Sequence, residues 1–341
     1  MKSFSRRTRF AVLPAALMLV LAACGGGGGG GQGSEPASPC DTAPDYPSRP
    51  IELIVPWAAG GGTDSVARYL GTQLAERLGT QVNVINRTGG SGVVGHSAIA
   101  TARPDGSTIG LATVEITMMH WQGLTDLTYE QLTPIGLVNE DPAGVTVRAD
   151  APWTDVQALL AEAGAQPGAL TASGTGRGGI WDLARAGMLL EAGLPPDAIR
   201  WVPSEGAAPA LQELVAGGVD VSTASLVENQ TMIQAGRAKA LGVMAEERDP
   251  KFPDVPTLRE QGIDITMAAW RGIAGPAGLP EDVVGELSCH LEAIVHSPAY
   301  EEFMGTAGFG IVWRNAQDFG AYLAQQDAEK GEIMRAAGLA A

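Results

Sequence analysis

The stretch IELIVPWAAGGGTDSVARYL, residues 51–70, decides the fold that this sequence predicts. Ile51–Val55 is a short apolar run rich in β-branched residues, which is typical of a buried strand. The glycines at 60–62 lack Cβ atoms and let a ligand approach the backbone closely. Thr63 or Asp64 can then cap a helix whose apolar residues share one face. Strand, loop and helix N-terminus together predict an anion site, and the alternative is a plain glycine-rich turn.

The alternation of strands and helices continues along the rest of the chain. Strands are expected at 81–86, 108–113, 135–139, 145–148, 170–173, 199–202, 219–223 and 241–245, with helices at 94–102, 154–163, 180–192, 209–216 and 227–235. Thr154 and Gln157 fit a capping box that opens one of these helices. From residue 281 the pattern is helical nearly to the end, with a break at 305–313, and no internal repeat is evident. This order predicts an α/β fold with mainly parallel sheets.

The first 23 residues have the pattern of a targeting segment. Four cations, Lys2, Arg6, Arg7 and Arg9, precede an apolar run at 10–23 that is too short to span a bilayer. Residues 21–24, LAAC, resemble the lipobox of bacterial lipoproteins and predict cleavage before Cys24 and lipidation of that residue. The alternative is an ordinary secretory signal. Residues 24–45 are rich in glycine and proline, which predicts a flexible tether. We therefore expect an extracytoplasmic protein that is lipid-anchored through Cys24.

Composition and charge exclude some classes of protein. The chain has 341 residues, of which 45% are hydrophobic and 18% are charged, which is enough for two globular lobes. Its formal net charge is −16, and removal of the targeting segment would make it −20. Such a protein does not bind nucleic acid through a basic surface. It also repels anions at long range, so an anionic ligand needs local hydrogen-bond donors.

Catalytic and cofactor motifs are weak or absent in the sequence. Gly174, Gly176 and Gly179 satisfy the GxGxxG spacing of dinucleotide sites, but Arg177 stands in the loop and no second nucleotide-binding half follows. The four histidines are scattered, and His290 and His296 are expected on the surface of one helix. No metal-ligand cluster and no nucleophile–base pair can be argued. The sequence therefore predicts a binding protein with no cofactor or metal and no enzymatic activity.

Many short motifs resemble one known family. They are 46–51 (YPSRPI), 55–57 (VPW) with Gly60, Gly61 and Asp64, 86–87 (NR), 89–95, 104–106 (PDG), 202–203 (VP), Gly206, 209–211 (PAL), 217–220 (GGVD), 236–238 (GRA), 254–258 (DVPTL), Trp270 and 278–280 (GLP). From about residue 46 to the C-terminus, the chain is similar to the Bug/TctC proteins. These are the extracytoplasmic solute receptors of tripartite tricarboxylate transporters.

The resemblance implies a two-lobed fold, similar to that of type II periplasmic binding proteins, that closes on a small carboxylate. Lobe 1 would comprise residues 46–143 plus 264–341, and lobe 2 would comprise residues 144–263. The partners would be membrane permease subunits, and the receptor itself would be a monomer. The alternative function is a sensor of the same fold that feeds a signalling partner. Ala59, Ser204-Glu205 and Trp181-Asp182 depart from the family pattern, so the ligand cannot be copied from a relative.

The candidate ligand-binding residues lie on the two glycine loops and at nearby strand ends. Trp57 would form a wall of the cleft, or alternatively be a core tryptophan. Asp64 would bind a hydrogen-bond donor group of the ligand, or alternatively cap its helix. Arg177 would pair with a carboxylate of the ligand, or alternatively be a solvated surface residue. The remaining candidates are main-chain and hydroxyl donors and residues at element ends: Gly61, Gly62, Thr63, Thr113, Ser173, Gly174, Thr175, Gly176 and Glu228.

Three cysteines are present, Cys24, Cys40 and Cys289. If Cys24 is lipidated, an even number remains in an oxidising compartment, and no spacing suggests a metal site. We therefore predict a disulfide between Cys40 and Cys289 that holds the end of the tether against lobe 1. The alternative is a buried Cys289 and a free Cys40.

Overall fold

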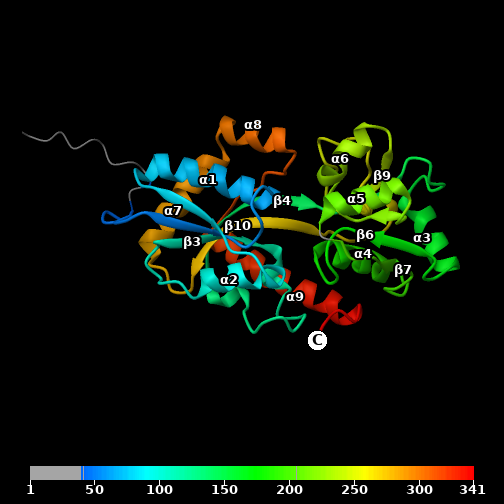
Figure 1. The fold of residues 1–341 in the computed structure, drawn as a ribbon, viewed down its shortest axis with the longest axis horizontal. Helices are drawn as coiled ribbons and strands as arrows, with labels where there is room; N and C mark the ends of the chain where they lie inside the picture. Colours follow the sequence, from blue (N-terminus) through cyan, green and yellow to red (C-terminus); the bar gives the residue numbers. More distant parts are fainter. Residues whose placement is uncertain (1–39, 41, 205) are drawn as a thin grey trace, which may run out of the picture. The chain divides into compact units, whose positions relative to one another are not determined.

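The protein contains two mixed β-sheets that are flanked by helices (Figure 1). The structure, a computed structural model, describes residue 40 and residues 42–204 and 206–341. The predicted signal segment, the lipidation at Cys24 and most of the tether lie outside the described residues. The chain passes from the first sheet to the second between Pro142 and Gly144 and returns between Val243 and Ala268. The predicted α/β class is confirmed.

The first sheet has the strand order β11-β4-β10-β3-β1-β2. Its strands are β1 (Ile51–Val55), β2 (Val82–Asn86), β3 (Thr108–Thr113), β4 (Leu132–Pro142), β10 (Ala268–Pro276) and β11 (Arg314–Asn315). Strand β1 pairs in parallel with β2 and β3. Strand β10 lies antiparallel between β3 and β4, and β11 is antiparallel to β4.

The second sheet has the order β7-β6-β8-β5-β9. Its strands are β5 (Gly144–Arg148), β6 (Leu170–Ser173), β7 (Ile199–Trp201), β8 (Val221–Ser222) and β9 (Ala238–Val243). Strand β6 is parallel to β7 and β8, whereas β5 is antiparallel to β8 and β9. The prediction of mainly parallel sheets is therefore wrong for both sheets. In each of them, two strands run antiparallel to their neighbours where the chain crosses between the sheets.

Helices cover both faces of the first sheet. The α-helices are α1 (Gly62–Leu78), α2 (Val93–Ala100), α3 (Val156–Ala165), α4 (Ile180–Glu191), α5 (Ala207–Ala216), α6 (Leu226–Gln234), α7 (Glu281–Val295), α8 (Pro298–Ala307) and α9 (Ala316–Ala336). Figure 1 shows α1 and α8 on one side of the first sheet and α2 and α9 on the other. Strand β1 explains this arrangement, since Ile51, Leu53 and Val55 face one hydrophobic cluster and Ile54 faces the other.

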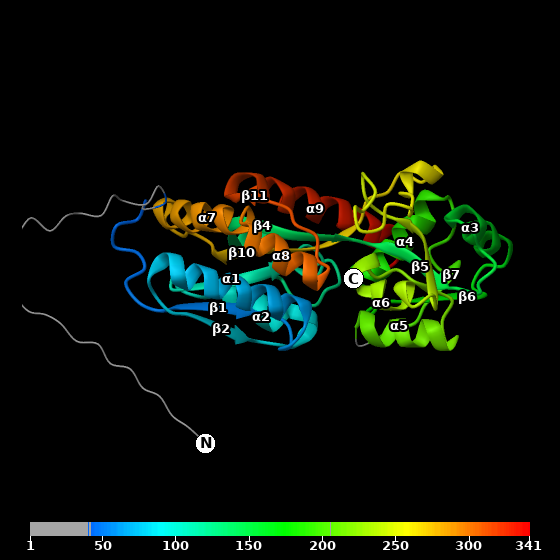
Figure 2. The ribbon, with the colours of Figure 1, turned by 90° about the horizontal axis from the view of Figure 1, so that it is seen from above.

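The C-terminal helix α9 connects the hydrophobic cores of the two sheets. Figure 2 shows α9 extending from the first sheet to α4, with which it packs. Gly187 permits this approach, because a Cβ there would lie 2.7 Å from Ile265 and 3.5 Å from Ile333. One hydrophobic cluster accordingly includes Leu183 and Met188 of α4 together with residues of the first sheet.

Two predicted helix caps and one predicted surface residue are corrected by the structure. The N-cap of α1 is Gly61, and neither Thr63 nor Asp64 occupies that position. The N-cap of α3 is Asp155, whose side chain accepts a hydrogen bond from the Ala158 N–H at 2.8 Å, and is not Thr154. His290 is 4% exposed because it faces the core side of α7, whereas His296 is exposed at the end of that helix.

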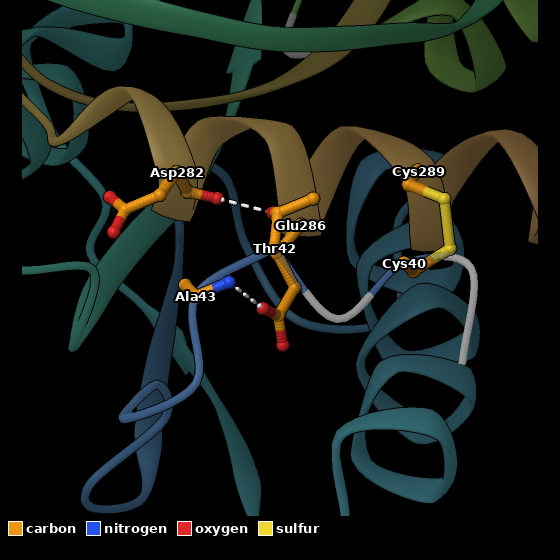
Figure 3. The surroundings of a disulfide bond; sticks show 6 residues. All are labelled: Cys40, Thr42, Ala43, Asp282, Glu286 and Cys289. Atoms are coloured by element: carbon orange, nitrogen blue, oxygen red, sulfur yellow. Dashed lines mark hydrogen bonds between the residues drawn. A yellow bond between two sulfur atoms is a disulfide. The ribbon is translucent and has the colours of Figure 1, made fainter. Parts of the chain in front are cut away.

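A disulfide joins Cys40 to Cys289 on α7, with 5.4 Å between their Cα atoms. The next residues also bond to α7 (Figure 3). The Thr42 Oγ1 hydroxyl donates to the Asp282 carbonyl, and the Ala43 N–H donates to Glu286 Oε2, both at 2.8 Å. The second bond gives the buried Glu286 carboxylate a hydrogen-bond partner. The start of the described chain is thus held against α7 by one covalent bond and two hydrogen bonds.

We expect no reactive thiol in the secreted protein once Cys24 is replaced by serine. Intact mass after alkylation should be unchanged without a reductant, and two thiols should react after reduction under denaturing conditions. The reason is that Cys40 and Cys289 are joined by a disulfide, which the oxidising compartment expected from the sequence would preserve. Two alkylated thiols without reductant would contradict the bridge.

Within the described residues, no helix is both long enough and apolar enough to cross a bilayer.

Candidate functional site

The first glycine loop joins β1 to α1 and leaves the first turn of this helix without a side-chain cap. Gly60 has a positive φ of 84°, which favours glycine, and Gly61 occupies the N-cap in an extended conformation. Since Gly61 has no side chain, it offers no oxygen to the first amides of α1. The positive end of the helix dipole therefore faces the space beside the exposed Gly61.

Asp64 supports this loop from below. Its carboxylate accepts hydrogen bonds from the Gly60 N–H at 2.8 Å, from Asn86 Nδ2 at 2.8 Å and from Arg68 Nε at 3.0 Å. Burial raises the pKa of Asp64, but these donors outweigh burial and hold the pKa below its usual value. The residue is 3% exposed, and both of its carboxylate oxygens already have hydrogen-bond partners. Asp64 therefore stabilises the loop from the protein interior and is not exposed where it could bind a ligand.

Trp57 begins a chain of hydrogen bonds at the ends of β1 and β3. Its indole Nε1–H donates to Thr113 Oγ1 at 3.1 Å, and the Thr113 hydroxyl donates to Glu115 Oε2 at 2.6 Å. The Trp57 side chain is half-buried, so part of the ring stays accessible to solvent. Thr113 is buried and has its hydroxyl engaged on both sides. These contacts fix the orientation of the indole beside the first glycine loop.

His96 on α2 fixes the position of Thr113 through a hydrogen bond, a role that the sequence did not reveal. The Thr113 N–H donates to His96 Nε2 at 3.1 Å, so the ring hydrogen lies on Nδ1, which donates to the Gly92 carbonyl at 2.8 Å. Burial lowers the pKa of His96 to about 4. The ring is therefore neutral at physiological pH and acts as a fixed bridge between α2 and β3.

Arg271 on β10 is the main site residue that sequence reasoning missed. Its Nε donates to Thr63 Oγ1 at 3.0 Å, and its Nη1 donates to Asp141 Oδ2 at 2.8 Å and to Asn139 Oδ1. The guanidinium carbon also lies 5.0 Å from the centroid of the Phe309 ring. With 13% of its side chain exposed, Arg271 holds a nearly buried charge against the first turn of α1.

Glu228 lies at the N-terminus of α6, in a capping box with Ser225. Glu228 is exposed to solvent. Partial desolvation of its carboxylate and the negative charge of Asp141 raise its pKa, and the positive charge of Arg271 opposes the increase. The predicted candidate Glu228 therefore interacts electrostatically with Arg271 and Asp141, although it belongs to a helix of the second sheet.

The second glycine loop joins β6 to α4. The Ser173 hydroxyl donates to the Val202 carbonyl at 2.7 Å, and the Ser204 N–H donates to the Thr175 carbonyl at 3.0 Å. Thr175 Oγ1 is buried and has no hydrogen-bond partner among the described residues. Gly174 is required for packing, since a Cβ there would lie 2.6 Å from Trp181. The exposed Gly176 lines a cavity of about 450 Å³ together with Ser173, Val202, Pro203 and Ser204.

Arg177 is exposed and lines a different cavity of about 240 Å³. This cavity is also lined by Arg200, Trp201 and Leu339, which lies two residues before the C-terminus. The structure therefore does not bring Arg177 into the cavity of Ser173 and Gly176, where the sequence interpretation grouped it.

Across the described residues, no cluster of three or more histidine, cysteine, aspartate or glutamate side chains is arranged to hold a metal ion.

A signal for Arg271 was present in the sequence, because it is the single charge in the apolar run 268–276. A charge at such a position needs a partner, but its partners Asn139 and Asp141 lie 130 or more residues away.

Comparisons with known proteins identify the family. Residues 66–339 match the family described as tripartite tricarboxylate transporter family receptor, TctC. A UPF0065 protein of Pseudomonas sp. (strain P51) is 32% identical over 269 residues, which cover 77% of this chain and 79% of the relative. Protein BugT of Bordetella pertussis is 29% identical over 272 residues, which cover 78% of this chain and 82% of BugT.

Solved structures show the same fold. A TctC solute-binding protein from Polaromonas is 35% identical, with a TM-score of 0.76, and covers 85% of this chain and 99% of its own. A Rhodopseudomonas palustris protein solved with adipate is 26% identical, with a TM-score of 0.75 and coverages of 87% and 99%. MatC from the same species, with bound malate, is 28% identical, with a TM-score of 0.70 and coverages of 86% and 99%. On this evidence from sequence and fold, the chain belongs to the TctC family of tripartite tricarboxylate transporter receptors, to which the Bug proteins are related.

Proposed function

We propose that this protein is an extracytoplasmic receptor that binds a small organic carboxylate and delivers it to the membrane subunits of a tripartite tricarboxylate-type transporter. The observation that carries the proposal is the uncapped first turn of α1, which lies beside the half-buried indole of Trp57. An uncapped helix N-terminus favours an anion, and an indole face favours a carbon skeleton. Related structures that hold malate and adipate support the same class of ligand.

In this proposal, main-chain amides hold most of the ligand carboxylate. Arg271 already pairs with Asp141, so its charge is largely balanced before a ligand arrives. Gly61, Gly62 and Thr63 would donate from α1, and Trp57 would form the wall. Residues Ser173 to Gly176 would face them from lobe 2, and the buried Thr175 hydroxyl would find its hydrogen-bond partner in the ligand.

The proposed lobes are residues 46–143 plus 264–341 and residues 144–263. Strand membership supports this division, because β1–β4, β10 and β11 form one sheet and β5–β9 form the other. Residues 1–23 would direct export, and Cys24 would carry the lipid anchor. The disulfide at Cys40 would then determine where the tether leaves the receptor.

A thermal-shift screen of mono-, di- and tricarboxylates tests the function. We expect at least one acid to raise the melting temperature, whereas its matching amide or alcohol does not. At a hundred times its dissociation constant, a ligand stabilises the folded state by about 2.7 kcal/mol. The proposal would be wrong if neutral sugars or amines stabilised the protein and no acid did.

A further inference from the structure

The two glycine loops share a short sequence pattern that becomes apparent only when their geometries are compared. Residues 60–64 read GGGTD and residues 178–182 read GGIWD, so both have the form Gly-Gly-x-x-Asp. In each case the second glycine is the N-cap of the following helix, and the aspartate is its third residue. The N-caps have similar backbone angles, φ −81° and ψ 172° at Gly61, and φ −72° and ψ 171° at Gly179.

The aspartate makes the same bond in both loops. Gly60 N–H donates to Asp64 Oδ2 at 2.8 Å, and Gly178 N–H donates to Asp182 Oδ2 at 2.9 Å. Both donor glycines have a positive φ, 84° at Gly60 and 72° at Gly178. Each bond therefore holds a glycine whose conformation is otherwise only weakly restricted.

An arginine on the same helix orients each carboxylate. Arg68 donates to Asp64 at 3.0 Å, and Arg185 donates through Nη2 to Asp182 at 2.6 Å. Arg185 also donates to the Ile199 carbonyl at 2.8 Å, which ties this pair to β7. Asp64 and Asp182 are 3% and 0% exposed, so water cannot readily replace their partners.

We propose that Asp64 and Asp182 are matched positioning residues that hold both glycine loops in shape before any ligand binds. A glycine N-cap leaves the first amides of the helix available, but it also leaves the loop without a side chain to fix it. The buried aspartate supplies that restraint through its hydrogen bond to the glycine N–H. That this restraint serves ligand binding rests on the proposed function, but the restraint itself can be measured without a ligand.

Amide hydrogen exchange of the ligand-free protein tests the proposal. We expect Asp64→Ala to speed exchange at 58–63 and Asp182→Ala to speed exchange at 174–179, each by at least about tenfold, because a buried charge-assisted hydrogen bond is lost. Asp64→Asn and Asp182→Asn should show smaller increases, since the amide oxygen can still accept from the glycine. Asp155→Ala is the matched control, because it removes the cap of α3 and leaves both loops untouched.

The design separates the restraint from general stability. Asp182→Ala leaves Arg185 buried without its carboxylate, so it can fail to fold, but Arg68 beside Asp64 is half exposed and keeps the first loop testable. Wild-type exchange at 58–63 in folded Asp64→Ala would overturn the proposal. Equal acceleration in Asp64→Ala and Asp64→Asn would also overturn it, as would equal acceleration of the loops in Asp155→Ala. A failed ligand screen would leave these results unaffected and would count against the binding function alone.

Discussion

Replacement of Arg271 by alanine is expected to lower the free energy of unfolding by about 3–5 kcal/mol. The change removes the cation that pairs with Asp141 at 2.8 Å and leaves that carboxylate, with 5% of its side chain exposed, uncompensated. It also removes the donor to Thr63 at the first turn of α1 and the contact with Phe309. Urea denaturation followed by circular dichroism measures the loss.

Two further variants make this test specific to the buried charge. Arg248→Ala removes an arginine that pairs with Glu260 at the surface, with 45% and 46% of the side chains exposed, and should change stability by at most about 1 kcal/mol. The double variant Arg271→Ala/Asp141→Ala should lose less than the sum of the single variants, because neither charge is left alone. A loss in Arg271→Ala as small as that in Arg248→Ala would contradict the importance of this network.

Valine at Gly61 or Gly176 is expected to weaken binding of the stabilising acid at least a hundredfold, equivalent to about 2.7 kcal/mol. The added side chain would occupy the space through which a carboxylate approaches the backbone. Folding should be preserved. A Cβ at Gly61 would meet only the Ala58 carbonyl, at 3.6 Å, and one at Gly176 would meet no atom within 4 Å. Neither residue has a positive φ, so the effect is steric alone.

Calorimetry with the acid identified by the thermal-shift screen measures this loss, and circular dichroism verifies the fold. Gly305→Val is the matched control, because a Cβ at this position in α8 also meets no atom within 4 Å and the residue belongs to neither glycine loop. It should bind with wild-type affinity. Wild-type affinity in Gly61→Val or Gly176→Val would remove the corresponding loop from the binding site.

Local patterns in the sequence were sufficient for much of the fold. The bounds of β1, β3 and β6 agree with the expected strands, since each is a short apolar run that ends at a loop. Strand β10 was not predicted, because Arg271, Gly272 and Gly275 interrupt its apolar pattern. Its place between β3 and β4 depends on antiparallel pairing with strands more than 120 residues earlier, and this made both the position and the mixed character of the sheet unpredictable.

The sequence by itself determined the family, the two glycine loops and the tryptophan beside one of them, because these are contiguous motifs with local causes. Only the tertiary structure showed that Arg271 forms hydrogen bonds to Asp141 and Thr63 and that His96 accepts one from the Thr113 N–H. It also showed that Asp64 and Asp182 bond to their loops in the same way. The first two sets of contacts join residues on different strands and helices, so no local pattern encodes them. The third set is local, but the pattern Gly-Gly-x-x-Asp does not by itself predict it. Both aspartates are buried, so their hydrogen-bond partners are the loop and nearby protein donors instead of water, and only the tertiary structure shows this burial.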